Sequence, residues 1–232
     1  SFAGAGQMLS FIATLVLGIF LHSAGPSLSP DGWAYWESSV SLLRGDGYRY
    51  LDGPPVIYWP PLFSVYLAGV QRLLGVSGFA ISTGLVLASG VSTVVWTRVL
   101  LSACSPEAPL RAAIAVRAFL VLFFSLNAMA LLSEVLFMPI LGALLLTLNV
   151  APASGDETKA FKPTRITVLL TLLLLCRNAG LAFVPGVVVF LCQRRSGRGR
   201  PTVVAAMVVG IPVVIWLLIR VALGQAQAQA FG

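Results

Sequence analysis

Eight apolar runs separated by polar segments dominate this sequence and limit what it can fold into. Most of them approach the roughly 20 apolar residues that a helix needs to cross the hydrocarbon core of a bilayer. Inside a bilayer each helix satisfies its own backbone hydrogen bonds. We therefore expect an all-α polytopic membrane protein whose first run is a retained membrane anchor. The runs lie at residues 8–24, 62–76, 79–97, 112–131, 134–150, 166–176, 179–192 and 202–223.

Charged residues are too few to coat a surface that faces water. They make up 10% of the chain, and the mean hydropathy is +0.93, whereas soluble domains carry about 25% charged residues. The formal net charge of +7 arises mostly from short loops, without the basic stripe and interleaved aromatics of a single-strand binder. We therefore expect no nucleic-acid partner. The three cysteines lack metal-ligand spacing and are expected to be buried free thiols.

Basic residues indicate which loops face the cytoplasm. Arg98 and Arg111 flank one short loop, and further lysines and arginines occupy the loops at 159–165 and 194–200. Positive charge favours the cytoplasmic side of a membrane. All three loops are therefore expected inside, and the runs between them pair into helices that leave and return.

The long segment 25–61 is expected on the opposite, outer side, since it holds four of the eight acidic residues. Its length and aromatic content indicate a functional loop. Only an odd number of crossings can join it to the Arg98 loop, yet two apolar runs lie between them. The shorter run, 62–76, is therefore expected to be an interfacial or re-entrant helix. The result is a single module over residues 1–232 with about seven transmembrane helices and a cytoplasmic N-terminus.

Within the outer loop, an amphipathic helix is predicted between Pro30 and Gly45, with Asp31 in its first turn. Asp31 allows two interpretations. It either caps this helix and complements its dipole, or it serves as a general base held at the membrane surface. The residues expected to form the apolar face are Trp33, Trp36, Val40 and Leu43.

Glu134 and Arg177 are two further charges beside apolar runs, both on the predicted outer side. A carboxylate at membrane depth is costly unless it is paired or functional, although Glu134 also fits a turn just outside the hydrocarbon. The planar guanidinium of Arg177 suits a phosphate or a carboxylate. A structural ion pair between the two is the alternative.

Other polar or aromatic residues converge on the same predicted face. Arg220 either binds substrate or snorkels to the interface. Tyr58 and Trp59 form either an aromatic belt or the wall of a lipid or sugar pocket. His22, the single histidine, lies at the outer end of the first run. This convergence is the main indication of a site.

Several motifs together resemble the GT-C membrane glycosyltransferases, in the branch of the protein O-mannosyltransferases and the lipid A aminoarabinose transferases. The resemblance covers nearly the whole chain and corresponds to the family's N-terminal seven-helix module. The motifs, in chain order, are Asp31-x3-Tyr35, Leu42-Leu43-x-Gly45-x-Gly47-Tyr48, Trp59-Pro60-Pro61-Leu62-Phe63, Leu132-Ser133-Glu134-x-Leu136-Phe137 and Cys176-Arg177-x2-Gly180-Leu181.

The resemblance implies an inverting transfer of sugar from a polyprenyl phosphate to an acceptor glycan, lipid or protein on the outer face of a bacterial inner membrane. In such a site Asp31 would deprotonate or orient the acceptor, with Glu134 near the sugar. Arg177 would stabilise the phosphate leaving group. Tyr35, Tyr58, Trp59 and Arg220 would complete the substrate-binding set. No nucleotide is implied; some relatives use a divalent metal, for which this sequence has no decisive ligand set.

Two other functions remain open from the sequence. Many relatives have an acidic or polar residue after the first aspartate, where this chain has Gly32, and this favours a non-catalytic scaffold with partner membrane subunits. Keeping Asp31, Glu134 and Arg177 together favours an enzyme. A transporter is the third candidate, against which the chain shows no inverted repeat and no paired broken helices.

Overall fold

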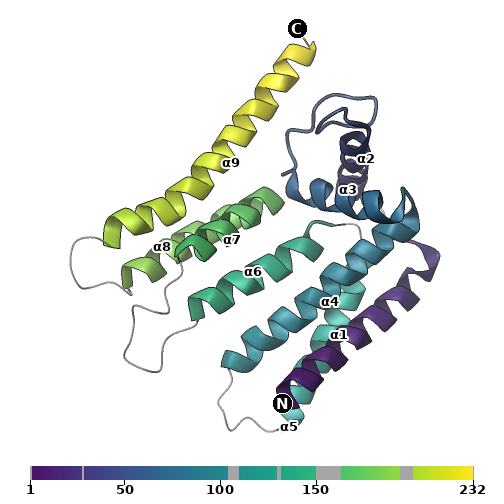
Figure 1. Ribbon diagram of the computed structural model, residues 1–232, viewed down its shortest axis with the longest axis vertical. Helices are drawn as coiled ribbons and strands as arrows, with labels where there is room; N and C mark the ends of the chain where they lie inside the picture. Colours follow the sequence, from purple (N-terminus) through teal and green to yellow (C-terminus); the bar gives the residue numbers. More distant parts are fainter. Residues whose placement is uncertain are drawn as a thin grey trace.

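The computed structural model describes residues 2–27, 29–103, 110–129, 132–149, 163–193 and 201–231. Within these ranges the chain is all-α, with nine α-helices, two short 3₁₀ helices and no sheet (Figure 1). The α-helices are α1 (Phe2–Leu21), α2 (Pro30–Arg44), α3 (Leu62–Leu74), α4 (Gly78–Ala103), α5 (Leu110–Ala128), α6 (Glu134–Asn149), α7 (Pro163–Cys176), α8 (Phe183–Gln193) and α9 (Pro201–Phe231). The 3₁₀ helices are η1 (His22–Ala24) and η2 (Asn178–Ala182).

Four helices are long and apolar enough to cross a membrane, as in a multi-pass integral membrane protein. Their spans are Gly4–Leu21 in α1, Gly78–Ser102 in α4, Leu110–Ala128 in α5 and Ala206–Leu223 in α9. Shorter apolar helices lie beside them. Many large apolar side chains on these helices are exposed, among them Phe20, Phe79 and Leu110. Such a surface suits lipid better than water.

The helices alternate in direction along the chain, except for α2 and α3. In Figure 1, α1, α5, α7 and α9 run from the lower to the upper end, whereas α4, α6 and α8 return. Helix α3 lies across the upper end of α4. Helix α3 thus stands apart from the alternating series, and the interfacial or re-entrant position expected for 62–76 stays a prediction.

Close contacts between small residues join α1 to α4. A Cβ atom on Gly18 would lie 2.9 Å from a methyl carbon of Val86. Further along the same seam, the hydroxyls of Thr14 and Thr93 share a buried hydrogen bond of 3.0 Å. Small side chains and interhelical hydrogen bonds hold helices together in a bilayer, where apolar burial between helices gives little driving force.

The seam between α4 and α6 provides a stability prediction. A Cβ atom on Gly142 would lie 2.6 Å from Cγ1 of Val95, a stiff side chain on a neighbouring helix. Gly142→Ala should therefore destabilise the protein by about 1–3 kcal/mol. The matched control is Gly210→Ala in α9, where nothing lies within 4 Å and alanine should be neutral or stabilising. Equal melting temperatures for the two variants in detergent would contradict this packing.

Helix α2 has the predicted ends but a different buried face. The Ser29 hydroxyl caps it by accepting a hydrogen bond from the Gly32 N–H at 3.0 Å, and Gly45 ends it with a φ of 86°. Of the residues expected on its apolar face, Val40 is buried, whereas Trp33 is 47% exposed.

Serine side chains fill the interface between α2 and α3 instead. Ser38 and Ser64 share a hydrogen bond of 2.7 Å, and the Gln71 amide donates to Ser39 at 2.7 Å. These small residues let the two helices approach closely, which the large Trp33 ring would prevent. The interface anchors the outer loop on α3.

Candidate functional site

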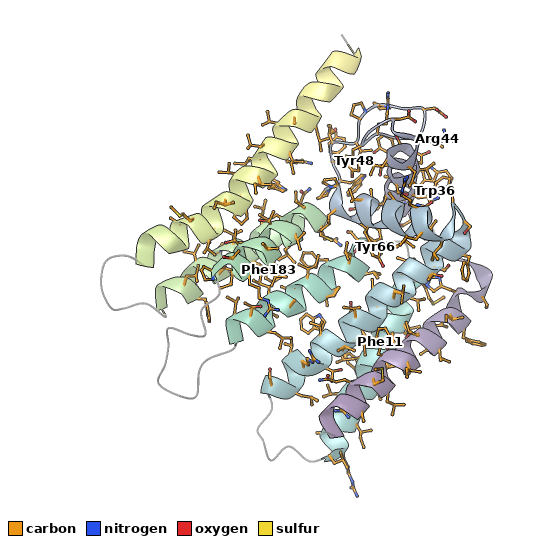
Figure 2. All side chains as sticks on the ribbon, viewed as in Figure 1. Phe11, Trp36, Arg44, Tyr48, Tyr66 and Phe183 are labelled. Atoms are coloured by element: carbon orange, nitrogen blue, oxygen red, sulfur yellow. The ribbon has the colours of Figure 1, made fainter. Side chains whose placement is uncertain are left out.

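The loop after α2 folds back on itself through backbone contacts. The Val56 N–H donates to the Tyr48 carbonyl at 3.1 Å, and the Tyr48 hydroxyl donates to the Trp59 carbonyl at 3.0 Å. Val56 is completely buried. Figure 2 shows Tyr48 at the same end of the molecule as Trp36 on α2. The loop therefore forms a folded layer over this end of the helices.

Tyr35 lies at the centre of the candidate site. It is 3% exposed, with its ring edge-on to Phe63 at a centroid distance of 5.0 Å and tilted against Trp59 at 6.0 Å. Burial raises the pKa of the Tyr35 hydroxyl; the Ser133 side chain and the Arg177 charge partly oppose this rise, and the Asp31 charge adds to it. The phenol therefore stays neutral at physiological pH.

Glu134 and Arg177 form an ion pair between two different helices. Glu134 is the first residue of α6, and Arg177 directly follows α7 in an extended conformation. Its Nη1 contacts Oε1 of Glu134, and the two side chains are 36% and 38% exposed. The second carboxylate oxygen, Oε2, is buried without a hydrogen-bond partner in the part of the chain that the structure describes. The pairing considered from the sequence is thus present.

Asp31 lies in the first turn of α2, but Ser29 is the residue that caps this helix. The negative charge of Asp31 contributes to the raised pKa of the Tyr35 hydroxyl. Within the described ranges, no cation forms a salt bridge with the Asp31 carboxylate. The position of Asp31 in the first turn also complements the helix dipole, and its role as a general base stays a prediction.

Tyr58 and Trp59 lie near the end of the outer loop, shortly before α3 begins. We call residues 57–59 the strap. The Tyr58 side chain is 64% exposed, whereas Trp59 packs against Tyr35. The Asn178 amide donates to the Tyr58 carbonyl at 3.2 Å. The role of Asn178 was missed from the sequence, because an asparagine two residues before a glycine, here Gly180, is typical of any turn.

Arg220 reaches the same strap from α9. Its Nη1 donates to the carbonyl of Ile57, and its guanidinium carbon lies 5.8 Å from the ring centroid of Trp216. The guanidinium thus has a backbone partner in the outer loop. Arg220 joins the site through this strap, and its substrate-binding role remains a prediction.

His22 and Cys176 are both buried. Burial lowers the pKa of His22, and the Ala128 backbone partly opposes this fall. Cys176 is a buried free thiol that donates to the Ser133 carbonyl at 3.6 Å; the side chains of Cys104 and Cys192 lie outside the described residues. Among the side chains that the structure describes, no group of three or more His, Cys, Asp or Glu is placed to hold a metal.

The structure thus brings the predicted site residues to one end of the bundle. Trp59 packs against Tyr35, the charges of Asp31 and Arg177 both act on the Tyr35 hydroxyl, and Glu134 pairs with Arg177. The remaining two, Tyr58 and Arg220, join through the backbone of the strap. Comparison with protein-family models, with curated proteins and with solved structures found no match.

Proposed function

We propose that this chain is a membrane glycosyltransferase that moves a sugar from a polyprenyl phosphate to an acceptor on the outer face of the membrane. The observation that carries this proposal is the ion pair of Arg177 with Glu134, whose arginine charge acts together with that of Asp31 on the buried Tyr35 hydroxyl. These charges come from three segments far apart in the sequence. Transfer chemistry needs a base and a cation near one reacting centre, and this cluster supplies both.

In the proposed reaction, the acceptor oxygen attacks the anomeric carbon of the donor sugar while its proton passes to the Asp31 carboxylate. The bond between that carbon and the phosphate oxygen breaks, and its electron pair leaves with the polyprenyl phosphate. Arg177 stabilises the charge that develops on the phosphate. Attack opposite the leaving group inverts the anomeric configuration. Glu134 holds Arg177 through their ion pair, while Tyr35 and Trp59 line the sugar side.

The proposed topology has seven crossing helices, α1 and α4 to α9 with α2 and α3 in the outer interface. Support comes from the alternating helix directions in Figure 1. The basic loops at 98–111, 159–165 and 194–200 would then face the cytoplasm; most of their residues lie outside the described ranges. The site would open to the outer side of a bacterial inner membrane.

A non-catalytic scaffold is the second candidate, and one observation favours it. Arg177 already has a carboxylate partner in Glu134, so its charge is accounted for without a phosphate. In that case the ion pair would fasten α6 to α7, and partner membrane subunits would use the outer loop as a docking surface.

Transfer of labelled sugar by the purified chain in lipid nanodiscs distinguishes the two functions. The donors are polyprenyl-phosphate mannose and aminoarabinose, and the acceptors are bacterial membrane lipid and protein extracts. The transferase predicts loss of label from one donor and its appearance in an acceptor fraction, above nanodiscs without protein. Retention of all label on every donor, by a chain that melts cooperatively, would contradict the transferase and favour the scaffold.

A further inference from the structure

Two neighbouring backbone carbonyls in the outer loop are each held by a side chain from the carboxy-terminal third of the protein. Arg220 on α9 donates to the carbonyl of Ile57, and Asn178 in η2 donates to the carbonyl of Tyr58. The donors lie 163 and 120 residues along the chain from their acceptors. Local folding of the loop therefore does not create either contact.

The strap that carries these carbonyls has a defined position on both sides. Before it, Val56 is completely buried; at its last residue, the Trp59 carbonyl accepts a hydrogen bond from Tyr48 and the Trp59 ring packs against Tyr35. Hence a movement at residues 57–58 would be transmitted to Trp59 and the centre of the site.

Arg220 and Asn178 hold the strap carbonyls with different side-chain groups. Arg220 contributes a guanidinium, whose planar fork loses less freedom on binding than a lysine side chain does, and Trp216 lies against it. Asn178 is adjacent to Arg177, so its amide ties the strap directly to the turn that bears the ion pair. The contact of Arg220 with the Ile57 carbonyl is part-buried, and a carbonyl removed from water that loses its partner is costly, which favours the clamped position of the strap.

We propose that Asn178 and Arg220 form a two-point clamp that positions the strap over Tyr35, so that both act as positioning residues. For Arg220 this differs from the expected contact with substrate. Naming the strap as a wall of the sugar site rests on the proposed function; the clamp itself does not. The short helix η2 and helix α9 thereby help to build a site whose loop comes from the amino-terminal part of the chain.

Limited trypsin digestion tests the clamp without any enzymatic activity. Arg49 is an exposed cleavage site in the same loop, and its cleavage in nanodiscs is followed by mass spectrometry. Asn178→Asp removes the amide donor, and Arg220→Met removes the guanidinium at similar length. Loss of one hydrogen bond costs about 0.5–1.5 kcal/mol, so local opening and cleavage should rise about 2- to 10-fold when cleavage follows the open population.

Matched controls separate the clamp from general destabilisation. Asn127→Asp changes an exposed amide that donates within its own helix, to Phe123, and Arg72→Met changes an exposed arginine of α3. Both should leave Arg49 cleavage at the wild-type rate, and Arg220→Lys should restore part of the protection. Unchanged cleavage in Asn178→Asp and Arg220→Met, or an equal rise in the controls, would overturn the clamp. If the clamp holds and no sugar is transferred, only the proposed function fails.

Discussion

Replacing Asp31 with asparagine should lower sugar transfer by about 10²–10⁴-fold, the usual contribution of a general base. Asparagine has almost the same shape but does not take the acceptor proton. Because no cation forms a salt bridge with the Asp31 carboxylate in the described part of the chain, the fold should tolerate the change. Initial rates of label transfer and the melting temperature of the purified variant check both expectations.

The control for Asp31→Asn is Asp46→Asn, which changes an exposed acid just beyond the end of α2. It removes the same charge from the same loop, away from Tyr35. Transfer by Asp46→Asn should match the wild type. If Asp31→Asn retains full activity, or if both variants lose activity equally, Asp31 is not the base.

Replacing Arg177 with lysine should lower transfer by about 10²–10³-fold, the cost of removing one preorganised donor from a developing negative charge. Lysine keeps the positive charge but lacks the planar fork that holds a phosphate at two points. The fold should change little, because the ion pair is more than a third exposed on both sides and such pairs contribute about 1 kcal/mol or less. Single-turnover rates measured alongside thermal melting separate the two effects.

Glu134→Gln provides the comparison that interprets the arginine variant. A pair that serves only to join α6 to α7 predicts similar, small losses of stability for Arg177→Lys and Glu134→Gln, with no selective loss of transfer. A phosphate-binding Arg177 predicts a large kinetic loss in Arg177→Lys that stability does not explain. A fully active Arg177→Lys variant would remove the phosphate role.

The positions of the helices were predictable from the sequence, because a helix that crosses a bilayer needs a continuous run of apolar residues. The run 134–150 corresponds to α6 at Glu134–Asn149, and the run 62–76 to α3 at Leu62–Leu74. Counting charges on either side of the membrane predicted only that 62–76 does not cross it, and α3 lies across the upper end of α4. The seven crossings themselves stay a prediction, of which the four long apolar helices are shown.

Contacts between distant segments were harder to predict. The sequence marks Glu134 and Arg177 as unusual charges, which made their pairing foreseeable. Nothing local marks Asn178 as the partner of the Tyr58 carbonyl, since any turn accepts asparagine. The serine face of α2 was missed for a related reason: hydropathy ranks Trp33 above Ser38 for burial, whereas close packing against α3 selects the smaller side chain.

Transfer assayed from one side of the membrane tests the central claim most directly. Right-side-out and inside-out vesicles containing the chain are given a short-chain, water-soluble analogue of the polyprenyl-phosphate sugar, with Asp31→Asn vesicles as the blank. The account predicts incorporation of label in right-side-out vesicles, and none in the inside-out preparation or the blank. Incorporation confined to inside-out vesicles, or equal in wild-type and Asp31→Asn vesicles, would contradict an outer-face site built around Asp31.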